Sequence, residues 1–367
     1  MTRVLVVNAG SSTLKLSVVE ADGRATGSKT LETLAGSLAA PEVERQIAEL
    51  GTVDAVGHRV VHGGTVYRTA VVVDDAVLAR LKSFTALAPL HQPRSLAALD
   101  LVRRALPDPP HVACFDTAFH STLPPAASTY AIPREWRDRW PLRRFGFHGL
   151  SHAYASRRTA ELLGRPITDL RTVTCHLGAG ASLAAVSGGM SVDTTMGFTP
   201  LEGLVMATRS GSVDPGLVLW VQTEGGMSAS EVADGLERDS GLVGLAGTAD
   251  MRGVLQRAAA GDAEATLALD VYVHRVRRGI AAMAASMGGV DALAFTGGVG
   301  ENAPEIRRRA VDGLGFLGIA VDPAQNESAT GDAVVGITGG SVGVVVIEAR
   351  EDLEVARQVR ACLEDRP

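Results

Sequence analysis

The stretch VLVVNAGSSTLKLSV, residues 4–18, decides the fold of this chain. Its first four residues form an uninterrupted apolar run, which is typical of a strand buried on both faces. Small and polar residues follow at 8–13, where glycine and hydroxyl side chains favour a turn. Apolar and polar residues then alternate over 14–18, as in a half-buried strand. The stretch therefore predicts two strands joined by a short turn.

The same order of elements returns near residue 171. A strand, a glycine turn, a second strand, another glycine turn and a third strand are expected between residues 171 and 193. This repeat of topology, rather than of sequence, predicts two related α/β domains with strands first and helices after. A boundary is expected near residue 120. Further strands are predicted at 53–61, 111–115, 292–295 and 342–347, and helices at 41–50, 74–84, 93–106, 214–225, 228–238, 248–259, 262–287 and 351–364.

The composition indicates a globular protein that handles small molecules. A length of 367 residues allows about two domains, and the hydrophobic content of 46% supports packed cores. A formal net charge of -6 and an aromatic content of 4% disfavour a nucleic-acid surface. The sequence shows no apolar run of the roughly 18 residues that a membrane helix needs. With no signal-peptide pattern at its start, the chain is expected to be cytoplasmic.

The three cysteines, Cys114, Cys175 and Cys362, are widely separated. Their spacing gives neither a disulfide framework nor a metal-binding pair. We expect each to serve as a small apolar side chain.

Three glycine-containing turns that follow apolar strands are candidate phosphate loops: residues 8–13, 178–182 and 297–302. Glycine lets a backbone approach an anion closely, and N–H groups can then face it. None matches the P-loop or the dinucleotide-binding pattern. Each taken alone is better explained as an ordinary hairpin turn.

Several charged residues lie in short polar segments where substrates are often bound. Arg59 and Arg209 are flanked by glycine-bounded sequence, and arginine suits forked binding of carboxylate or phosphate. Asp116 follows a predicted strand, a common catalytic position in α/β proteins. For Asp193 and Glu351, an interpretation as capping or surface residues is favoured by the residues alone.

Two further patterns favour structural interpretations. His58 and His62 stand four apart, as in a helical zinc pair, but the segment between them reads as a strand end. The run from Arg134 to Arg144 is predicted to be a solvated face with Trp136 and Trp140 buried beneath it.

Eight motifs in order resemble those of the acetate kinase family, within the acetate and sugar kinase, Hsp70 and actin superfamily. They are found at residues 8–15, 57–64, 88–91, 115–120, 144–149, 191–203, 208–211 and 298–302. The resemblance extends from Val4 to about Ala356. It implies a duplicated ribonuclease-H-like fold with an active site in an interdomain cleft. The N-terminal domain would comprise 1–120 plus 353–367, and a nucleotide-binding C-terminal domain 121–352.

The resemblance also implies a reaction, its co-substrates and an assembly. ATP and acetate would give ADP and acetyl phosphate, with Mg²⁺ or, as a second candidate, Mn²⁺ as the metal, in a homodimer. The catalytic residues would be Arg59, Asp116, His148 and Arg209, and the metal ligands Asn8 and Glu351. Arg59, Val61, Leu90, Phe147 and Pro200 would bind the short acid. ATP would be held by Ser11, Ser12, Thr13, Lys15, His176, Gly178, Ala179, Gly180, Asp250, Met251, Arg252, Gly298, Val299, Gly300 and Asn302.

The implied chemistry suits these residue types. A carboxylate is already ionised at neutral pH and needs no general base. The difficulty is to bring two anions together and to stabilise charge on the phosphoryl oxygens, which arginine, histidine and magnesium can do. We therefore expect direct in-line transfer.

The chain departs from the family pattern at a few positions. Ala179 replaces an asparagine in the second phosphate loop, Thr65 replaces a glutamate, and Arg350 lies where a Pro-Thr-Asn segment is usual. These changes bear on nucleotide affinity and on the assignment of Glu351. A propionate or butyrate kinase is the nearest alternative, and an ATP-dependent switch like actin or Hsp70 is the alternative of another class.

Overall fold

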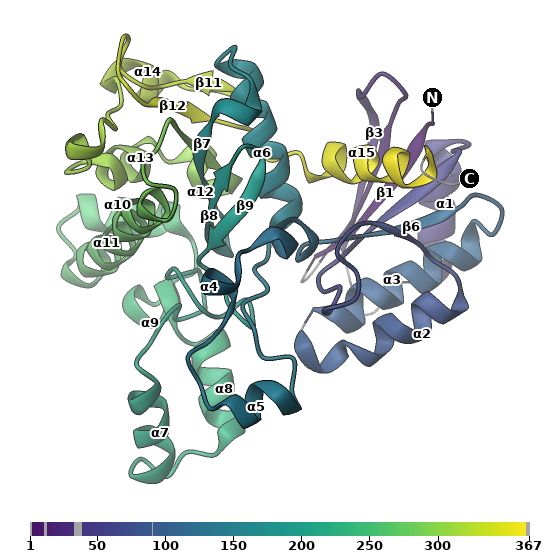
Figure 1. Cartoon of the computed structure of the whole chain (residues 1–367), viewed down its shortest axis with the longest axis horizontal. Coiled ribbons are helices and arrows are strands. Elements are labelled where there is room, and N and C mark those ends of the chain that lie inside the picture. Colours follow the sequence, from purple (N-terminus) through teal and green to yellow (C-terminus); the bar gives the residue numbers. More distant parts are fainter. Residues whose placement is uncertain (1, 11–12, 33–38, 90, 365–367) are drawn as a thin grey trace. The chain divides into compact units, whose positions relative to one another are not determined.

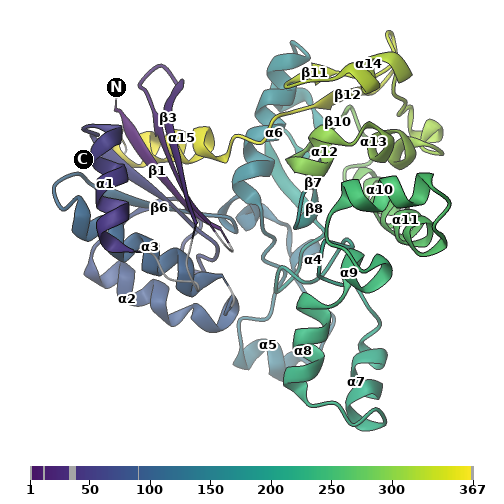
Figure 2. The ribbon, with the colours of Figure 1, turned by 180° about the vertical axis from the view of Figure 1, so that it is seen from behind.

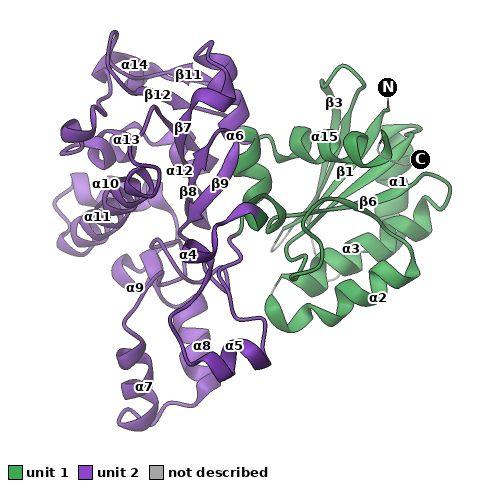
Figure 3. Ribbon diagram, in the orientation of Figure 1, with its two compact units in different colours: residues 1–121, 147–154, 350–367 green, residues 122–146, 155–349 purple. Residues whose placement is uncertain are grey.

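The computed structural model describes residues 2–10, 13–32, 39–89 and 91–364. The chain divides into two compact units, coloured separately in Figure 3. Unit 1 contains residues 1–121, 147–154 and 350–367, and unit 2 contains residues 122–146 and 155–349.

Unit 1 is built on a six-stranded sheet in the order β3-β2-β1-β4-β6-β5 (Figure 1). Its strands are β1 (Val4–Ala9), β2 (Thr13–Val19), β3 (Ala25–Glu32), β4 (Ala55–Val60), β5 (Val71–Val72) and β6 (His111–Phe115). The first three strands form an antiparallel meander, β1, β4 and β6 run parallel, and β5 pairs antiparallel with β6. The opening stretch of the sequence thus supplies β1 and β2, two of the three strands of the meander.

Helices cover both faces of this sheet, and β1 shows why. Leu5 and Val7 pack with α1 (Ala40–Leu50) and α3 (Gln92–Ala105), while Val4 and Val6 pack with α15 (Glu351–Glu364). Because successive side chains of a strand point to opposite faces, an uninterrupted apolar run is needed where both faces are buried. α2 (Asp75–Ser83) packs on α3.

Unit 2 repeats the strand order of unit 1 (Figure 2). Its sheet is ordered β11-β12-β10-β7-β8-β9, from β7 (Arg171–Leu177), β8 (Ala181–Ser187), β9 (Met190–Thr194), β10 (Ala292–Thr296), β11 (Ala333–Val334) and β12 (Gly343–Val346). β7, β8 and β9 form the meander, β7, β10 and β12 are parallel, and β11 pairs antiparallel with β12. The predicted repeat of topology is confirmed.

The long helix α11 (Ala263–Ser286) packs on β7, β8 and β9. The other helices are α4 (Pro125–Ser128), α5 (Arg134–Arg139), α6 (Gly149–Leu162), α7 (Pro215–Thr223), α8 (Ala229–Arg238), α9 (Gly241–Ala246), α10 (Met251–Ala259), α12 (Gly297–Asn302), α13 (Pro304–Val311) and α14 (Pro323–Ser328). Short 3-10 turns lie at Thr85–Leu87, Ala118–Thr122, Ile167–Asp169 and Gly315–Leu317. Within the described part of the chain, no helix combines the length and the apolar character needed to cross a membrane.

Two local predictions are wrong, and one helix was not predicted. Residues 297–302, predicted as a glycine turn, form the short helix α12. Trp136 and Trp140, predicted to be buried, expose 52% and 44% of their surface. α6, which begins at the end of a recognised motif, was missed. Cys114 and Cys175 are buried as expected, and Cys362 is partly buried.

Candidate active site

In unit 1 the parallel strands place three site residues at neighbouring strand ends. β1 pairs with β4 so that Val7 lies opposite His58, which brings Asn8 level with Arg59. β4 pairs with β6 up to Val60 and Phe115, and Asp116 follows directly. The carboxyl ends of parallel strands are the usual location of ligand sites in α/β sheets.

Arg59 is the centre of a polar cluster made by these strand ends and by α15. Its Nε donates to Asp116 Oδ1 at 3.0 Å and its Nη2 to Asp116 Oδ2 at 2.7 Å, a forked ion pair. Its Nη1 donates to Asn8 Oδ1 at 3.2 Å and lies 3.4 Å from Glu351 Oε2. The structure therefore brings together Asn8, Arg59, Asp116 and Glu351, which are up to 343 positions apart in the sequence.

In this cluster, burial disfavours the charged forms of Arg59 and Asp116, whereas the ion pairs between the arginine and the carboxylates favour them. Burial lowers the pKa of Arg59, but Asp116 and Glu351 outweigh it and raise that pKa. Burial raises the pKa of Asp116, and Arg59 opposes this by holding the carboxylate in its charged form. The Asp116 side chain is only 2% exposed, so its charge depends on the arginine beside it.

Asn8 and Glu351 are the predicted metal ligands. Asn8 Nδ2 donates to Glu351 Oε2 at 3.2 Å, so the two side chains lie in contact. One carboxylate and one amide oxygen fit the chemistry of Mg²⁺, which takes few protein ligands and completes its shell with water and phosphate oxygens. The Asn8 amide would have to turn its oxygen from Arg59 toward the ion. The described residues include no cluster of three or more His, Cys, Asp or Glu side chains that could hold a metal by itself.

The segment 147–149 is tied to the same strand end. Gly149 N donates to the Asp116 carbonyl at 2.9 Å, and a Cβ at Gly149 would collide with that carbonyl oxygen. Phe147 is buried edge-on to His62, and its carbonyl lies 3.0 Å from His120 Nε2. His148 has a φ of 55°, a left-handed conformation that is uncommon for residues other than glycine. Strained backbone of this kind gathers at functional sites.

In unit 2 the central residue is Arg209. Its Nη1 donates to the Pro200 carbonyl at 2.7 Å, and within the described ranges it forms no ion pair. Burial lowers the pKa of Arg209, and Glu237 opposes that shift from a distance. The guanidinium is thus partly desolvated without a carboxylate in contact, an arrangement that favours an incoming anion.

A polar network fixes the segment that carries Pro200. Arg144 Nη1 donates to the carbonyls of Thr195 and Met196, both at 3.1 Å, and its Nη2 donates to Glu202 Oε1 at 2.6 Å. The Tyr130 hydroxyl donates to Glu202 Oε2 at 2.5 Å. It also accepts from the Phe198 N–H at 2.9 Å. We name Tyr130, Arg144 and Glu202 the loop network.

The second glycine turn lies close to both α12 and the Arg209 segment. Gly178 N donates to the Gly180 carbonyl at 2.9 Å, and the Ala179 carbonyl accepts from Ala207 N at 3.0 Å. A Cβ on Gly178 would lie 3.9 Å from Gly298 N, which places the 178–180 turn beside the start of α12. The structure therefore brings the 178–180 and 297–302 segments together, as β7 and β10 pair through His176 and Thr296.

The remaining predicted nucleotide residues are dispersed. Asn302 Nδ2 donates to the Gly298 carbonyl at 3.0 Å within α12. Asp250 is the N-cap of α10, and both Asp250 and Arg252 are exposed and paired with each other. Lys15 is exposed on β2 opposite Asn8. Ser11, Ser12 and Leu90 lie outside the described residues.

Comparison with known proteins decides the family. The model of the Acetokinase family matches residues 42–357. The acetate kinase of Leifsonia xyli subsp. xyli is 44% identical over 389 residues, covering 98% of this chain and 98% of that protein. The chain belongs to the acetokinase family.

Solved structures agree with the fold of this family. The crystal structure of Porphyromonas gingivalis acetate kinase matches with a TM-score of 0.90 and 34% identity, covering 99% of this chain and all of that one. A propionate kinase from Francisella tularensis subsp. tularensis SCHU S4 matches with a TM-score of 0.89 and 34% identity, covering 98% and 99%. The predicted actin-like ATPase fold, with two ribonuclease-H-like halves, and the prediction of a kinase of this family are confirmed.

The sequence did not predict the loop network of Tyr130, Arg144 and Glu202. Arg144 and Glu202 lie within recognised motifs, but we gave them no role there, and Tyr130 lies outside every motif. The only sequence signal was the presence of an arginine and a glutamate in glycine-rich segments. Their pairing spans 58 positions and that of Tyr130 with Glu202 spans 72, so no local pattern reveals them.

Proposed function

We propose that this protein transfers the γ-phosphoryl group of ATP to acetate, giving acetyl phosphate and ADP. An acetate oxygen forms a bond to the γ-phosphorus while the bond from that phosphorus to the β–γ bridging oxygen breaks in line. ADP leaves with the bridging oxygen. The observation that carries the proposal is Arg209, a partly desolvated guanidinium whose contact is a neutral carbonyl.

The proposal assigns the two arginines different tasks. Arg209 would contact the carboxylate and the phosphoryl oxygens, where developing charge needs fixed donors. Arg59 is already bound by Asp116 and Glu351, so it would order that end of the site and share its remaining donor capacity with an anion. His148 would donate to an equatorial phosphoryl oxygen. No general base is needed, because acetate is ionised at neutral pH.

The proposal extends to ATP, the co-substrate of this kinase family, and to its metal. The 178–180 turn and the start of α12 would lie along the nucleotide, with the dispersed residues Asp250, Met251, Arg252 and Asn302 near its base or sugar. Asn8 and Glu351 would hold Mg²⁺, which when bound neutralises phosphate charge. Ser11, Ser12, Thr13 and Lys15 would face the phosphates from the first turn.

Substrate choice would rest on four residues proposed to surround the methyl group: Val61, Leu90, Phe147 and Pro200. Phe147 is buried, and Val61 is partly exposed. One methylene changes transition-state binding by only about 1–3 kcal/mol in such pockets. Propionate is therefore the second candidate, favoured by a propionate kinase that matches this chain as closely in structure as an acetate kinase does.

Hydroxylamine trapping of the acyl phosphate tests the proposal. Purified protein with MgATP should give hydroxamate with acetate, less with propionate and least with butyrate. A higher kcat/KM for propionate would reassign the substrate. ATP hydrolysis without hydroxamate from any of the three acids would contradict the proposal and favour an ATP-dependent switch.

We further propose a cytoplasmic homodimer whose interface includes α7. This helix buries none of its residues in the chain, and Leu219 and Trp220 expose 62% and 60% of their surface. Apolar side chains gathered in this way are typical of an interface. Light scattering after size exclusion should give twice the mass of 38.1 kDa, and the L219E/W220E variant should give the single mass.

The predicted domain division remains part of this proposal: an N-terminal domain of residues 1–120 plus 353–367 and a nucleotide-binding domain of residues 121–352. Limited proteolysis would test the boundary near residue 120, and ATP binding to the isolated fragment of residues 121–352 would test the nucleotide-binding role.

A further inference from the structure

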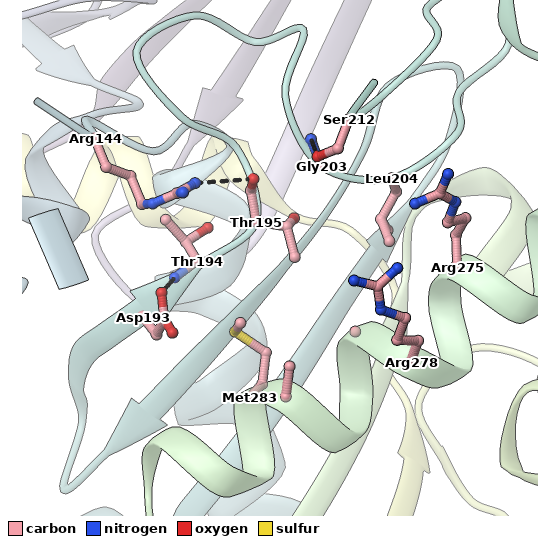
Figure 4. A pocket seen from close by; sticks show the side chains of 12 residues that line it. Arg144, Asp193, Thr194, Thr195, Gly203, Leu204, Ser212, Arg275, Arg278 and Met283 are labelled. Carbon is pink, nitrogen blue, oxygen red and sulfur yellow. Dashed lines mark hydrogen bonds between the residues drawn. The ribbon is translucent and has the colours of Figure 1, made fainter. Parts of the chain in front are cut away.

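A pocket of about 340 Å³ lies in unit 2 between α11, the end of β9 and the segment 203–212 (Figure 4). Three arginines line it: Arg144, Arg275 and Arg278. Apart from Arg144 of the loop network, none of the pocket residues was assigned to the candidate active site. Its volume is within the range of small-molecule sites.

Two of the arginines carry a positive charge that no described carboxylate meets in an ion pair. Arg275 and Arg278 are three positions apart on α11, so they share one face of the helix, and Figure 4 shows both side chains projecting beside Leu204. Across the described ranges, neither guanidinium forms a hydrogen bond or an ion pair. Like charges in this spacing repel each other, and an anion between them would remove the repulsion.

The other polar groups of the pocket are one carboxylate, which already accepts two hydrogen bonds, and two hydroxyls. Asp193 is occupied, because its Oδ2 accepts from Ser286 Oγ at 2.7 Å and its Oδ1 from Thr194 N at 2.8 Å. Ser212 Oγ accepts from Gly203 N at 3.1 Å, which leaves its own hydrogen available. Thr195 Oγ1 likewise accepts from Leu183 N at 2.9 Å.

We propose that this pocket binds a small oxyanion with two or more negative charges, either a phosphate monoester or a polycarboxylate. Forked guanidinium groups match the oxygens of both classes. The hydroxyls of Ser212 and Thr195 add two further donors, and Asp193 is the one carboxylate among the lining residues. The third arginine, Arg144, adds to the positive field although its own donors are used by Glu202 and two carbonyls.

The position of the pocket links it to the kinase reaction, and this part rests on the proposed function. The lining includes Thr195, Gly203 and Ser212, which lie in the same segment as Pro200 and Arg209. Arg144 both lines the pocket and holds that segment. An anion bound there changes the restraint on the loop that presents Arg209, and so changes the rate of phosphoryl transfer.

Calorimetric titration of the full-length protein tests the site without any catalysis. The probes are propane-1,2,3-tricarboxylate and glycerol 3-phosphate, which separate the two sources of charge. Wild type should bind at least one of them at one site per chain. The R275A/R278A and R275Q/R278Q variants should bind at least tenfold more weakly, while Arg134→Ala, which removes an exposed arginine of the same unit, should bind as wild type does.

Each outcome decides one part of the proposal. Absence of binding of both probes to wild type, or equal binding to the folded double variants, would overturn the site. The linkage is measured as kinase rate at saturating MgATP and acetate, each variant relative to its own rate without probe. A change in wild type and Arg134→Ala but not in the double variants supports it, and an unchanged wild-type rate with the probe bound would overturn it. Loss of kinase activity altogether would contradict the proposed function while the titration still decides the site.

Discussion

Arg59 and Arg209 were predicted for the same task, but their surroundings differ. Arg59 of unit 1 is held by a forked ion pair to Asp116, by Asn8 and by Glu351. Among the described residues, the guanidinium of Arg209 in unit 2 hydrogen-bonds only to the Pro200 carbonyl. The pKa of Arg59 is raised by its carboxylates, whereas burial lowers the pKa of Arg209.

The different surroundings of the two arginines suit them to two different tasks: one maintains the structure of the site, and the other binds the ligand. A guanidinium already matched by two carboxylates gains little from one more anion, because its charge is compensated. A partly desolvated guanidinium without a carboxylate gains more stabilisation from an anion. The anion compensates for the hydration that the guanidinium lost on burial. We therefore infer that Arg59 chiefly stabilises the fold of its strand ends and that Arg209 chiefly stabilises the transferring group.

Replacement of Arg59 by alanine should have the largest effect on stability. It leaves the buried Asp116 without its cation, and breaking a buried pair in this way costs about 3–5 kcal/mol. Urea unfolding followed by circular dichroism measures the loss. Arg45→Ala, which removes an exposed ion pair with Glu42, is the control and should change the midpoint far less. A midpoint for Arg59→Ala equal to that of the control would contradict the structural role of Arg59.

The loop network should affect catalysis through Arg209. Glu202→Ala leaves Arg144 without its carboxylate and Tyr130 without its acceptor, a cost of about 1–3 kcal/mol for each unsatisfied group. We expect kcat/KM for acetate to fall by about 10- to 100-fold, with a smaller fall in Tyr130→Phe. Initial rates measure this, with Asp138→Ala on the exposed α5 as the control. Equal rates in Glu202→Ala and the control would show that the network does not position Arg209.

The free energy of unfolding should depend on pH through the buried histidines of unit 1. Burial lowers the pKa values of four histidines of unit 1, to about 4 for His62 and His120, and His58 and His111 lie in contact at 2.8 Å. Since the unfolded histidines have a pKa of 6.5, the unfolded chain binds protons that the folded chain excludes as pH falls from 6.5 toward 4. Stability is thus complete above pH 6.5 and decreases below it, by about 1.4 kcal/mol per pH unit for each such histidine.

Urea midpoints between pH 7 and 4.5 check this slope. His120→Gln should make it shallower, because glutamine can keep the contact with the Phe147 carbonyl without titrating. A slope identical to that of wild type would mean that His120 does not remain neutral in the folded chain.

The smallest effect is expected at Ala179. Its side chain is exposed at the second glycine turn, so asparagine fits there and can supply one amide donor. One hydrogen bond contributes about 0.5–1.5 kcal/mol, so Ala179→Asn should lower KM for ATP by about two- to tenfold with kcat little changed. Ala179→Ser serves as the control with a shorter side chain. An unchanged or higher KM for ATP in the asparagine variant would place this turn away from the nucleotide.

Much of the fold was readable from the sequence because its strands carry strong local patterns. The apolar run at 4–7 results from burial on both faces of the sheet, and the alternation at 14–18 results from burial on one face. Both strands were predicted. α12 was mistaken for a turn because three of its six residues are glycine, which disfavours helices by intrinsic propensity. Its packing on β7 and β10 overrides that preference.

The candidate site was only partly readable. Arg59 and Asp116 stood out as charged residues at strand ends, and strand pairing does bring them together. The charge of Arg59 is paired with carboxylates and that of Arg209 is not. This difference depends on contacts between residues far apart in sequence. The same holds for Tyr130, whose role arises from a glutamate 72 positions away.

The central claim is that Arg209 receives the reacting anion, and the Arg209→Ala variant tests it most directly. Hydroxamate formation with acetate and the free energy of unfolding should be measured on the same preparation. We predict that kcat falls by at least about 10²–10³-fold, while the free energy of unfolding changes by about 1 kcal/mol or less. A near-normal rate would contradict the claim, and so would a loss of activity that merely follows a loss of folding.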